Sequence, residues 1–213
     1  MQSTFKHYRY RLYPTKAQAA FLDGELREAC SLYNAALEER IGAWKTCRKS
    51  ISYYDQQRQL KPMRADGCLK LTNAQTGHDV LRRLDRAFRV FYNRNRRGQK
   101  QGYPRFKSSS RYSSITYPTY GNGCKLLDSG RLRIQGAGHI KIVTHRPIAG
   151  KIKTVNIKKS AGQWYAGFCA ECEAAPSTPL MCASIGIDVG VTSFAVLSDG
   201  VAIKNPRHYR NAE

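Results

Sequence analysis

The chain has 213 residues, enough for one large or two small domains with a hydrophobic core. Its 36 Lys and Arg residues outnumber its 15 Asp and Glu residues, and the resulting formal net charge of +21 argues against an ordinary enzyme with a small neutral substrate. Such a field attracts polyanions. Because the sequence also lacks a membrane-spanning apolar run and the apolar core of a signal peptide, we expect a cytoplasmic protein that binds nucleic acid and no membrane.

In residues 5–13, "FKHYRYRLY", aromatic or apolar side chains alternate with basic ones. This alternation predicts a strand with one packed face and one positive face. Tyr8 and Tyr10 fall on the face that we expect to join the core. Next, Thr15 and Gln18 have the spacing of a capping box, which predicts the start of a helix. Apolar side chains then recur every three or four residues and are expected to pack: Leu22, Leu26, Ala29, Tyr33, Leu37, Ile41 and Trp44.

Residues 46–71 are polar and irregular, with a short helix expected around "SYYDQQRQL". Thr72 and Gln75 repeat the capping-box spacing, which predicts that a second long helix begins there. This helix has two different faces, because Arg82, Arg86 and Arg89 share a side that its apolar residues do not occupy. The apolar set is Val80, Leu81, Leu84, Phe88, Phe91 and Tyr92.

Residues 82–111 hold eleven Lys and Arg residues and a single acid, Asp85. A charge run is usually a solvated face, but these charges would repel one another unless phosphates neutralised them. Tyr103, Phe106 and Tyr112 stand among them, as suits stacking on single-stranded or looped RNA, although Phe106 has a second reading as a residue that packs the following barrel. The predicted nucleic-acid-binding residues are Arg82, Arg83, Arg86, Arg89, Arg94, Arg96, Arg97, Lys100, Tyr103, Arg105, Phe106, Lys107 and Arg111.

Beyond Ser110 the apolar period changes to two, in "RLRIQG", "HIKIVTH", "KIKTVNIKK" and "QWYAGFCAE". This pattern predicts four or five short antiparallel strands in a small sheet or barrel, with Trp164 in its core. Residues 152–159 and 163–172, joined by "SAG", are predicted to form a hairpin. The outer face is expected to carry exposed lysines: Lys141, Lys151, Lys153, Lys158 and Lys159.

The seven cysteines are irregularly spaced and, without a secretion signal, are expected to be reduced thiols. Only Cys169 and Cys172, in "CAEC", resemble a metal motif. They lie in a predicted strand, where residues three apart point to opposite faces, and no second pair completes a tetrahedral site. We therefore expect no zinc site in this chain.

Residues 186–200, "GIDVGVTSFAVLSDG", place the carboxylate of Asp188 in an apolar run that reads as a buried or central strand. Two more strands are expected to follow, with Asp199 and Gly200 in a tight turn, so that three consecutive strands pair in antiparallel fashion. A buried carboxylate is costly unless a cation or hydrogen bonds compensate it. Two readings are open for Asp188: a structural residue bonded to the amides of the following turn, or a magnesium ligand.

Three stretches occur in a fixed order: "YRLYPTKAQ", "LRRLDRAFRVFYNRNRRGQKQGYPRFKS" and "GIDVGVTSFAVLSDG". Together they resemble the TnpB family, transposon-encoded RNA-guided DNA endonucleases related to type V CRISPR effectors. The resemblance implies an α+β fold, in which an oligonucleotide-binding-like β-barrel called the wedge contains an inserted helical recognition lobe and precedes an RNase H-like RuvC domain. The implied parts are residues 1–13, the first wedge strand; 14–100, the recognition lobe, also described as helix-turn-helix-like; 101–175, the wedge barrel; 176–182, a linker; and 183–213, the opening strands of the RuvC domain.

The resemblance also implies a mechanism and partners. Family members bind a guide RNA from the transposon end and target double-stranded DNA, and cleave through magnesium ions held by three acids. By resemblance, Asp188 would be the first of these acids and a magnesium ligand, while the other acids and a zinc site lie in the family beyond the point that Glu213 reaches. We therefore expect this chain alone not to cleave DNA, to associate with the prokaryotic nucleoid, and to have a missing C-terminal half or a full-length homologue as a further partner.

Two other classes remain open. A non-catalytic basic RNA-binding protein would explain the charge, with Asp188 merely structural. A fragment of an actin-like or sugar-kinase ATPase is the second, because "GIDVGVTS" also resembles the phosphate-binding hairpin of that fold. The order of the three stretches favours the TnpB reading over both.

Overall fold

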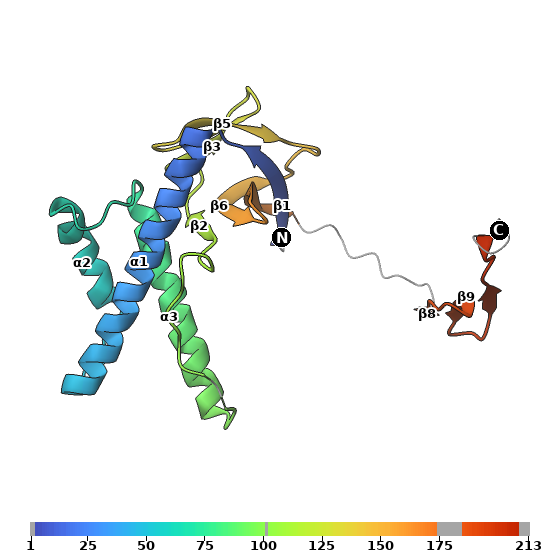
Figure 1. Cartoon of the computed structure of the whole chain (residues 1–213), viewed down its shortest axis with the longest axis horizontal. Helices are drawn as coiled ribbons and strands as arrows, with labels where there is room; N and C mark the ends of the chain where they lie inside the picture. The colour runs from blue at the N-terminus through green and yellow to red at the C-terminus, as the bar shows by residue number, and fades with distance from the viewer. Residues whose placement is uncertain (1–2, 101, 174–184, 209–213) are drawn as a thin grey trace. The chain divides into compact units, whose positions relative to one another are not determined.

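A computed structural model describes residues 3–100, 102–173 and 185–208 of the chain (Figure 1). The chain divides into two compact units, Met1–Ala174 and Ala175–Glu213. The predicted linker, 176–182, and the predicted start of the last domain at residue 183 lie outside the described residues. None of the described helices is both long and apolar enough to cross a membrane.

Over residues 3–173, the first unit contains an antiparallel sheet of seven strands in the order β2-β6-β7-β1-β5-β4-β3. Strand β2 is at one edge and β3 at the other, yet a short turn joins the two in sequence, so the sheet is nearly closed into a barrel. The predicted barrel strands are present, with β2 and β3 in addition. The bounds are β1 (Ser3–Tyr13), β2 (Ser114–Tyr117), β3 (Cys124–Leu126), β4 (Arg131–Ile134), β5 (Gly138–Val143), β6 (Lys151–Ser160) and β7 (Gln163–Glu173).

The alternating sequence of β1 buries one face of the strand and exposes the other, as predicted. Tyr8, Tyr10 and Leu12 are buried, while Arg9 and Arg11 on the other face are exposed. The β6–β7 hairpin is also confirmed, and its turn residues Ala161 and Gly162 both have positive φ (48° and 73°), as a tight two-residue hairpin turn requires.

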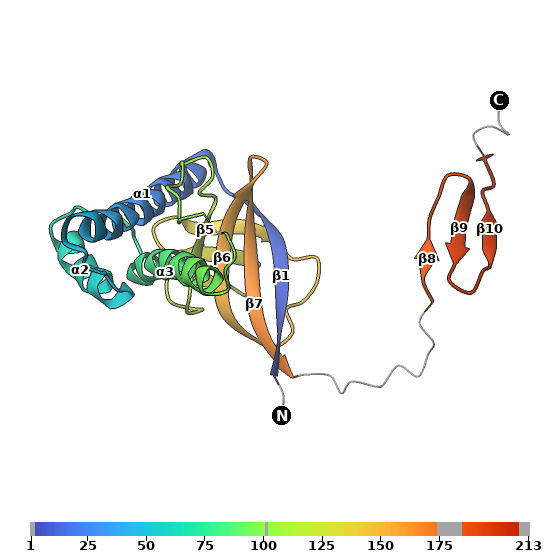
Figure 2. The ribbon, with the colours of Figure 1, turned by 90° about the horizontal axis from the view of Figure 1, so that it is seen from below.

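Three helices of this described unit lie together on one side of the sheet (Figure 2). They are α1 (Lys16–Cys47), α2 (Tyr53–Ala65) and α3 (Ala74–Arg96). The capping box at Thr15 and Gln18 is confirmed: the Thr15 side chain accepts from the Gln18 amide, and the Gln18 side chain accepts from the Thr15 amide. Trp44, predicted to lie in the core, is half exposed, because the last turns of α1 line an open cavity instead of packing on the sheet.

The start of α3 differs from the prediction. Asn73 is the N-cap, and its side-chain oxygen accepts from the Gln75 amide at 2.9 Å. Thr72 instead donates both its amide and its hydroxyl to the buried carboxylate of Glu25 on α1 (3.1 and 2.7 Å). A buried carboxylate is stabilised by hydrogen-bond donors. Thr72, which the local spacing predicted as the N-cap, therefore bonds to Glu25 instead of capping the helix.

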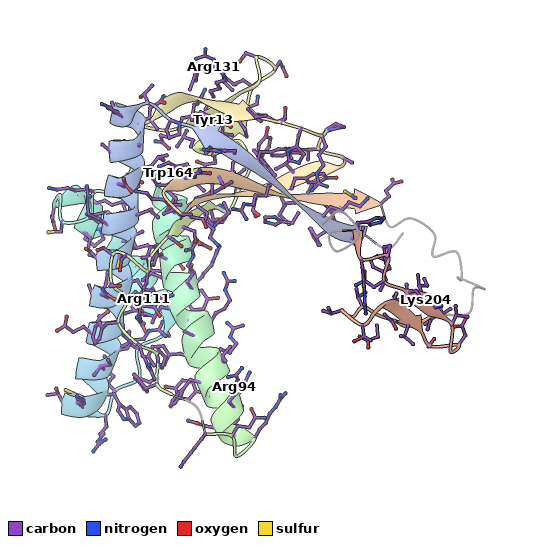
Figure 3. All side chains as sticks on the ribbon, turned by 45° about the vertical axis from the view of Figure 1, so that its right-hand side comes forward. Tyr13, Arg94, Arg111, Arg131, Trp164 and Lys204 are labelled. Atoms are coloured by element: carbon purple, nitrogen blue, oxygen red, sulfur yellow. The ribbon has the colours of Figure 1, made fainter. Side chains whose placement is uncertain are left out.

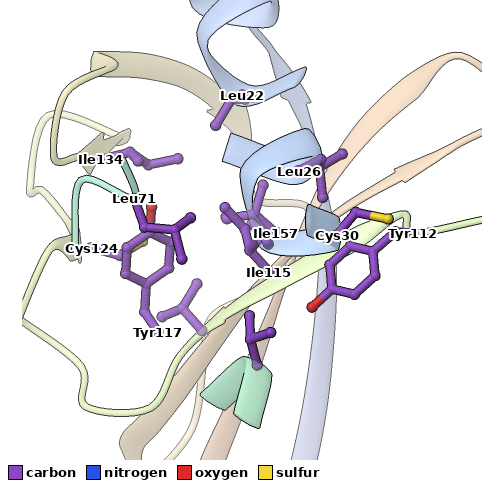
Figure 4. Packing of buried hydrophobic residues seen from close by; sticks show 14 of the residues in the cluster. Leu22, Leu26, Cys30, Leu71, Tyr112, Ile115, Tyr117, Cys124, Ile134 and Ile157 are labelled. Atoms are coloured by element: carbon purple, nitrogen blue, oxygen red, sulfur yellow. The ribbon is translucent and has the colours of Figure 1, made fainter. Parts of the chain in front are cut away.

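One hydrophobic core joins the helices to the sheet (Figure 4). Leu26 of α1, Ile115 of β2 and Ile157 of β6 meet in it, and Trp164 of β7 is buried as predicted. Tyr112, read in the sequence as a stacking residue, is buried too, with its ring 6.2 Å from that of Tyr33. It therefore supports the junction between helices and barrel and is not on the surface.

The second unit, over the described residues 185–208, has the three predicted antiparallel strands β8 (Ile187–Asp188), β9 (Ser193–Leu197) and β10 (Ala202–Lys204), in the order β10-β9-β8. The turn at Asp199 is present, and its carboxylate accepts from the Val201 amide at 3.0 Å. The expectation of a buried or central strand is wrong for Asp188, because β8 is an edge strand whose two residues are exposed. Three short strands provide no second layer within this described part to cover them.

Candidate nucleic-acid interface

After α3 the chain folds back along the helix towards the sheet, and we name residues 102–111 the return segment (Figure 1). The Tyr103 ring packs edge-on against Phe88 and Phe91 of α3, with ring centroids 5.4 and 5.2 Å away. Further along, Asn34 of α1 accepts from the Lys107 amide at 2.9 Å and donates to the Lys107 carbonyl at 2.8 Å. The return segment is thus attached to both long helices, which holds its basic side chains in place.

Arg82, Arg86 and Arg89 form one exposed row on α3, which we name the α3 stripe. The row is as predicted from the helical spacing. Arg89 pairs with Asp85 at 3.0 Å, and Arg86 lies 3.8 Å from Asp79. Asp79 and Asp85 are buried or half-buried, but the two arginine side chains are 67% and 70% exposed, so these guanidinium groups remain accessible to phosphate.

The α3 stripe lies between two hollows. One, of about 490 Å³, is shared with α2 and is lined by Tyr53, Tyr54 and Gln57 in addition to the stripe. The other, of about 570 Å³, is shared with the return segment and includes Arg86 and Arg105. A row of cations flanked by aromatic and amide side chains can bind a phosphate backbone and the bases beside it.

Arg83 is placed differently from its neighbours, although all are part of the same charge run. Its side chain is 23% exposed, against 67% for Arg86. The guanidinium donates to the Asp79 carboxylate at 2.8 Å, to the Ser114 carbonyl at 2.6 Å and to the Thr116 hydroxyl at 2.6 Å. These bonds attach α3 to β2, so a phosphate would have to displace partners that the fold already supplies.

The remaining predicted residues gather at the far end of α3 and on the return segment (Figure 3). Phe106 is exposed, so the alternative in which it packs against the barrel is wrong. Lys107 lies with its ammonium nitrogen 5.1 Å from the centre of the Tyr33 ring. The residues exposed in this region are Arg94, Arg96, Arg97, Lys100, Tyr103, Arg105, Phe106, Lys107 and Arg111.

The sequence reading missed the contribution of α2. Tyr53, Tyr54 and Gln57 face the α3 stripe across the hollow, and the Arg82 guanidinium lies 5.9 Å from the Tyr53 ring centre. The available signal was the aromatic pair in "SYYDQQ", directly after a good N-cap, Ser52. Spacing alone could not show that this helix lies beside the basic face of α3.

Several titratable groups at or beside this surface have shifted pKa values, and partial burial raises that of Tyr103. Burial, with the nearby charges of Arg82 and Arg64, lowers the pKa of His78 below its usual 6.5. Burial raises the pKa of Tyr112 to about 12, so its hydroxyl stays protonated at any physiological pH.

The predicted magnesium ligand, Asp188, lies in the second unit, opposite Val196 of β9. Among the described residues, no three His, Cys, Asp or Glu side chains come together in a group that could hold a metal ion.

Comparison with known proteins shows which family and which relatives the chain is similar to. Residues 1–49 match a family described as a helix-turn-helix domain; over the described part of that range the structure has the strand β1 followed by the single helix α1. A protein of Streptomyces pristinaespiralis, named as a candidate RNA-guided DNA endonuclease, is 30% identical over 99% of this chain and 52% of its own length. The candidate RNA-guided DNA endonuclease InsQ of Escherichia coli strain K12 is 28% identical over 64% of this chain and 32% of its own length.

A solved structure, the cryo-EM structure of a Cas12f1–sgRNA–target DNA complex, matches 98% of this chain and 59% of that one, with 12% identity and a TM-score of 0.48. The chain spans about half the length of the Streptomyces relative. The similarity to the Streptomyces protein extends along nearly all of this chain and agrees with the three ordered sequence motifs. The matching family model, these two relatives and the three ordered motifs together support a TnpB family protein.

Proposed function

We propose that this chain binds a structured guide RNA and target double-stranded DNA as part of an RNA-guided DNA endonuclease associated with transposition. The α3 stripe is the observation that carries the proposal, because its arginines are exposed, weakly paired and flanked by two hollows. The net charge of +21 and the names of the relatives support the same reading.

In this proposal the exposed cations of the α3 stripe and of the return segment bind phosphates, and base pairing by the guide reads the target sequence. The RNA would come from the transposon end. Tyr103 and Phe106 supply aromatic surface next to those cations, whereas Arg83 serves the fold. Phosphate contacts of this kind make affinity fall steeply as salt rises, by roughly one unit of slope for each neutralised phosphate.

We also propose that Asp188 contributes one carboxylate to a magnesium site, since hard divalent cations prefer such oxygens. When bound, magnesium would activate a water and stabilise the leaving oxygen of the scissile phosphate. The described residues contain no group of three or more possible metal ligands, so in this proposal a C-terminal half or a full-length homologue supplies the further ligands needed for cleavage.

The test is to purify the chain from its host, sequence the RNA that copurifies, and measure binding of that RNA across a salt series. The triple variant Arg82→Ala, Arg86→Ala and Arg89→Ala should lower the salt slope by about 2 to 3 units. A matched control, Lys125→Ala, Lys141→Ala and Lys151→Ala, removes the same charge from exposed positions of the sheet and should keep most of the slope.

Recovery of one structured RNA from a transposon end, together with a slope that depends on the α3 stripe, would support the proposal. Bulk ribosomal or transfer RNA bound without preference, with equal losses in both triple variants, would contradict it. That result would favour the non-catalytic basic RNA-binding protein instead.

A further inference from the structure

A third hollow, of about 550 Å³, lies between the C-terminal parts of α1 and α3 and the loop that follows α1. It shares border residues with both hollows beside the α3 stripe: Asp85 and Arg89 with the one at α2, and Phe91 and Tyr103 with the one at the return segment. Its volume falls within the range of pockets that hold small molecules and cofactors. The proposed function uses Arg89 and Tyr103 on the border of this cavity but assigns no ligand to the cavity itself.

The walls of the cavity are aromatic side chains from three different segments. Trp44 of α1 and Tyr92 of α3 are each 51% exposed, and Tyr103 of the return segment is 41% exposed. Phe88 lies behind them, with its ring centre 6.1 Å from that of Tyr92 in a stacked arrangement. Large aromatic rings left open to solvent around one hollow provide flat surfaces on which a planar group can stack.

Arg40 of α1 also lines this cavity and is the polar group that the apolar walls enclose. Its side chain is only 7% exposed. Its Nε donates to the Gln56 side chain at 2.9 Å, Nη1 lies 3.5 Å from the Asp85 carboxylate, and the guanidinium carbon is 5.0 Å from the Phe88 ring centre. Within the described residues, Nη2 is buried and has no hydrogen-bond acceptor. A buried donor without an acceptor is unfavourable, and more so on a charged group, so a nearby ligand acceptor would offset this cost.

The rim of the cavity is positive. Lys49 and Arg89 line it, and the Arg48 guanidinium lies 5.9 Å from the centre of the Trp44 ring. A ligand that fits all three features is planar, carries a hydrogen-bond acceptor on its edge, and is attached to a negative group. A nucleotide of a single-stranded or looped RNA has this chemistry.

We propose that this cavity binds one unstacked base of the bound RNA, stacked on Trp44 and Tyr92, with the edge of the base towards the Arg40 guanidinium and the rim cations on its phosphate. The inference rests on the proposed function, because it presupposes that the chain binds RNA. It adds a site at which a single base, and not the phosphate backbone alone, contributes to affinity.

The experiment places 4-thiouridine at successive positions of the copurified RNA, irradiates each complex and maps the crosslinked peptides by mass spectrometry. One position should crosslink to peptides that contain Trp44, Tyr92 or Tyr103. Replacing that nucleotide by an abasic one should weaken binding by about 5- to 100-fold, as expected for the loss of one stacked base.

The variants Trp44→Ala and Tyr92→Ala should weaken binding to the same degree without lowering the salt slope. Both side chains are half exposed, so truncation should leave the fold intact, which thermal unfolding verifies. In the double variant the abasic substitution should cause little further loss, since base and rings form one interaction. Tyr54→Ala is the matched control, an exposed aromatic residue that lines a different hollow and should keep the full abasic effect.

If RNA binds with a stripe-dependent salt slope but no crosslink maps to this cavity, or the abasic loss is equal in the wild type and the double variant, the base-binding site is overturned while the proposed function stands. If the chain binds no RNA, both are overturned.

Discussion

At the scale of single residues, neighbouring arginines of α3 have different tasks. Arg83 donates hydrogen bonds to Asp79, Ser114 and Thr116 within the fold, while Arg86, three residues later, is mostly exposed. A guanidinium that joins a helix to a strand stabilises the folded state, whereas an exposed one mainly adds to the electrostatic field. Charge alone therefore does not identify which arginine meets a ligand.

We predict opposite effects for the two substitutions. Arg83→Ala should lower the free energy of unfolding by about 2 kcal/mol, because it leaves polar groups of β2 and Asp79 without their partner, and should leave the salt slope of RNA binding unchanged. Arg86→Ala should change stability by less than about 0.5 kcal/mol and lower the slope by about one unit. Chemical denaturation and salt-dependent binding measure both quantities, and equal slopes for the two variants would contradict the assignment.

His78 makes stability depend on pH. Because burial and two nearby arginines lower its pKa in the folded state, the folded chain binds fewer protons than the unfolded one once the pH falls below about 6.5. The unfolding temperature of the wild type should therefore decrease between pH 7.5 and pH 5.5. His78→Gln should reduce this decrease, and the control His139→Gln, at an exposed position of β5, should not. Parallel pH profiles for wild type and His78→Gln would refute the mechanism.

At the scale of elements, the beginning of α3 depends on contacts from distant parts of the chain. Asn73 caps the helix and also donates to the side chains of Asn122 and Gln135, which lie in the turns that follow β2 and β4. The N-cap of α1, Thr15, bonds locally to Gln18. One residue thus joins α3 to two turns of the barrel, while the other serves its own helix.

Substitutions at the two N-caps should lower the free energy of unfolding by different amounts. Thr15→Ala should lower the free energy of unfolding by about 1 kcal/mol, the usual value for an exposed N-cap. Asn73→Ala should cost about 2–3 kcal/mol, because it also leaves the Asn122 and Gln135 oxygens without a donor. Urea denaturation monitored by circular dichroism compares them, and equal losses would mean that the amide contacts contribute nothing.

At the scale of the whole molecule, the hydrophobic core formed by the described residues lies in the first unit. All residues of the core cluster fall between Tyr8 and Cys172, and they join α1, α2 and α3 to the barrel. The described residues of the second unit leave large apolar side chains exposed, among them Ile187, Val191 and Phe194. Burial of apolar area drives folding, so the stability of the chain resides in residues 3–173.

A fragment of residues 1–174 should therefore unfold cooperatively, within a few degrees of the full chain, and bind RNA with nearly the same salt slope. Scanning calorimetry and the binding series test this directly. Asp188→Ala in the full chain is the matched control and should leave both quantities unchanged, since the residue is exposed and lies in the other unit. Loss of RNA binding by the fragment would mean that residues after 174 contribute to the interface.

Local patterns in the sequence predicted the elements well where the signal lies within a few residues. The alternation of β1, the capping box at Thr15 and the turn at Ala161 and Gly162 are all present, because each depends on backbone geometry and neighbouring side chains. Helical spacing likewise placed Arg82, Arg86 and Arg89 in one row. The family could also be read from three motifs and their order.

Only the tertiary structure decided which faces are covered. Periodicity shows that Trp44 and Leu37 share a face of α1. It does not show that the elements packed on this face cover Leu37 but stop short of Trp44, which lines a cavity instead. In the same way, Tyr112 and Tyr103 have similar neighbours in sequence, yet one is buried at the junction with the barrel and the other lines an open hollow. Burial depends on what packs from elsewhere in the chain, and this information is not contained in the spacing of residues along one element.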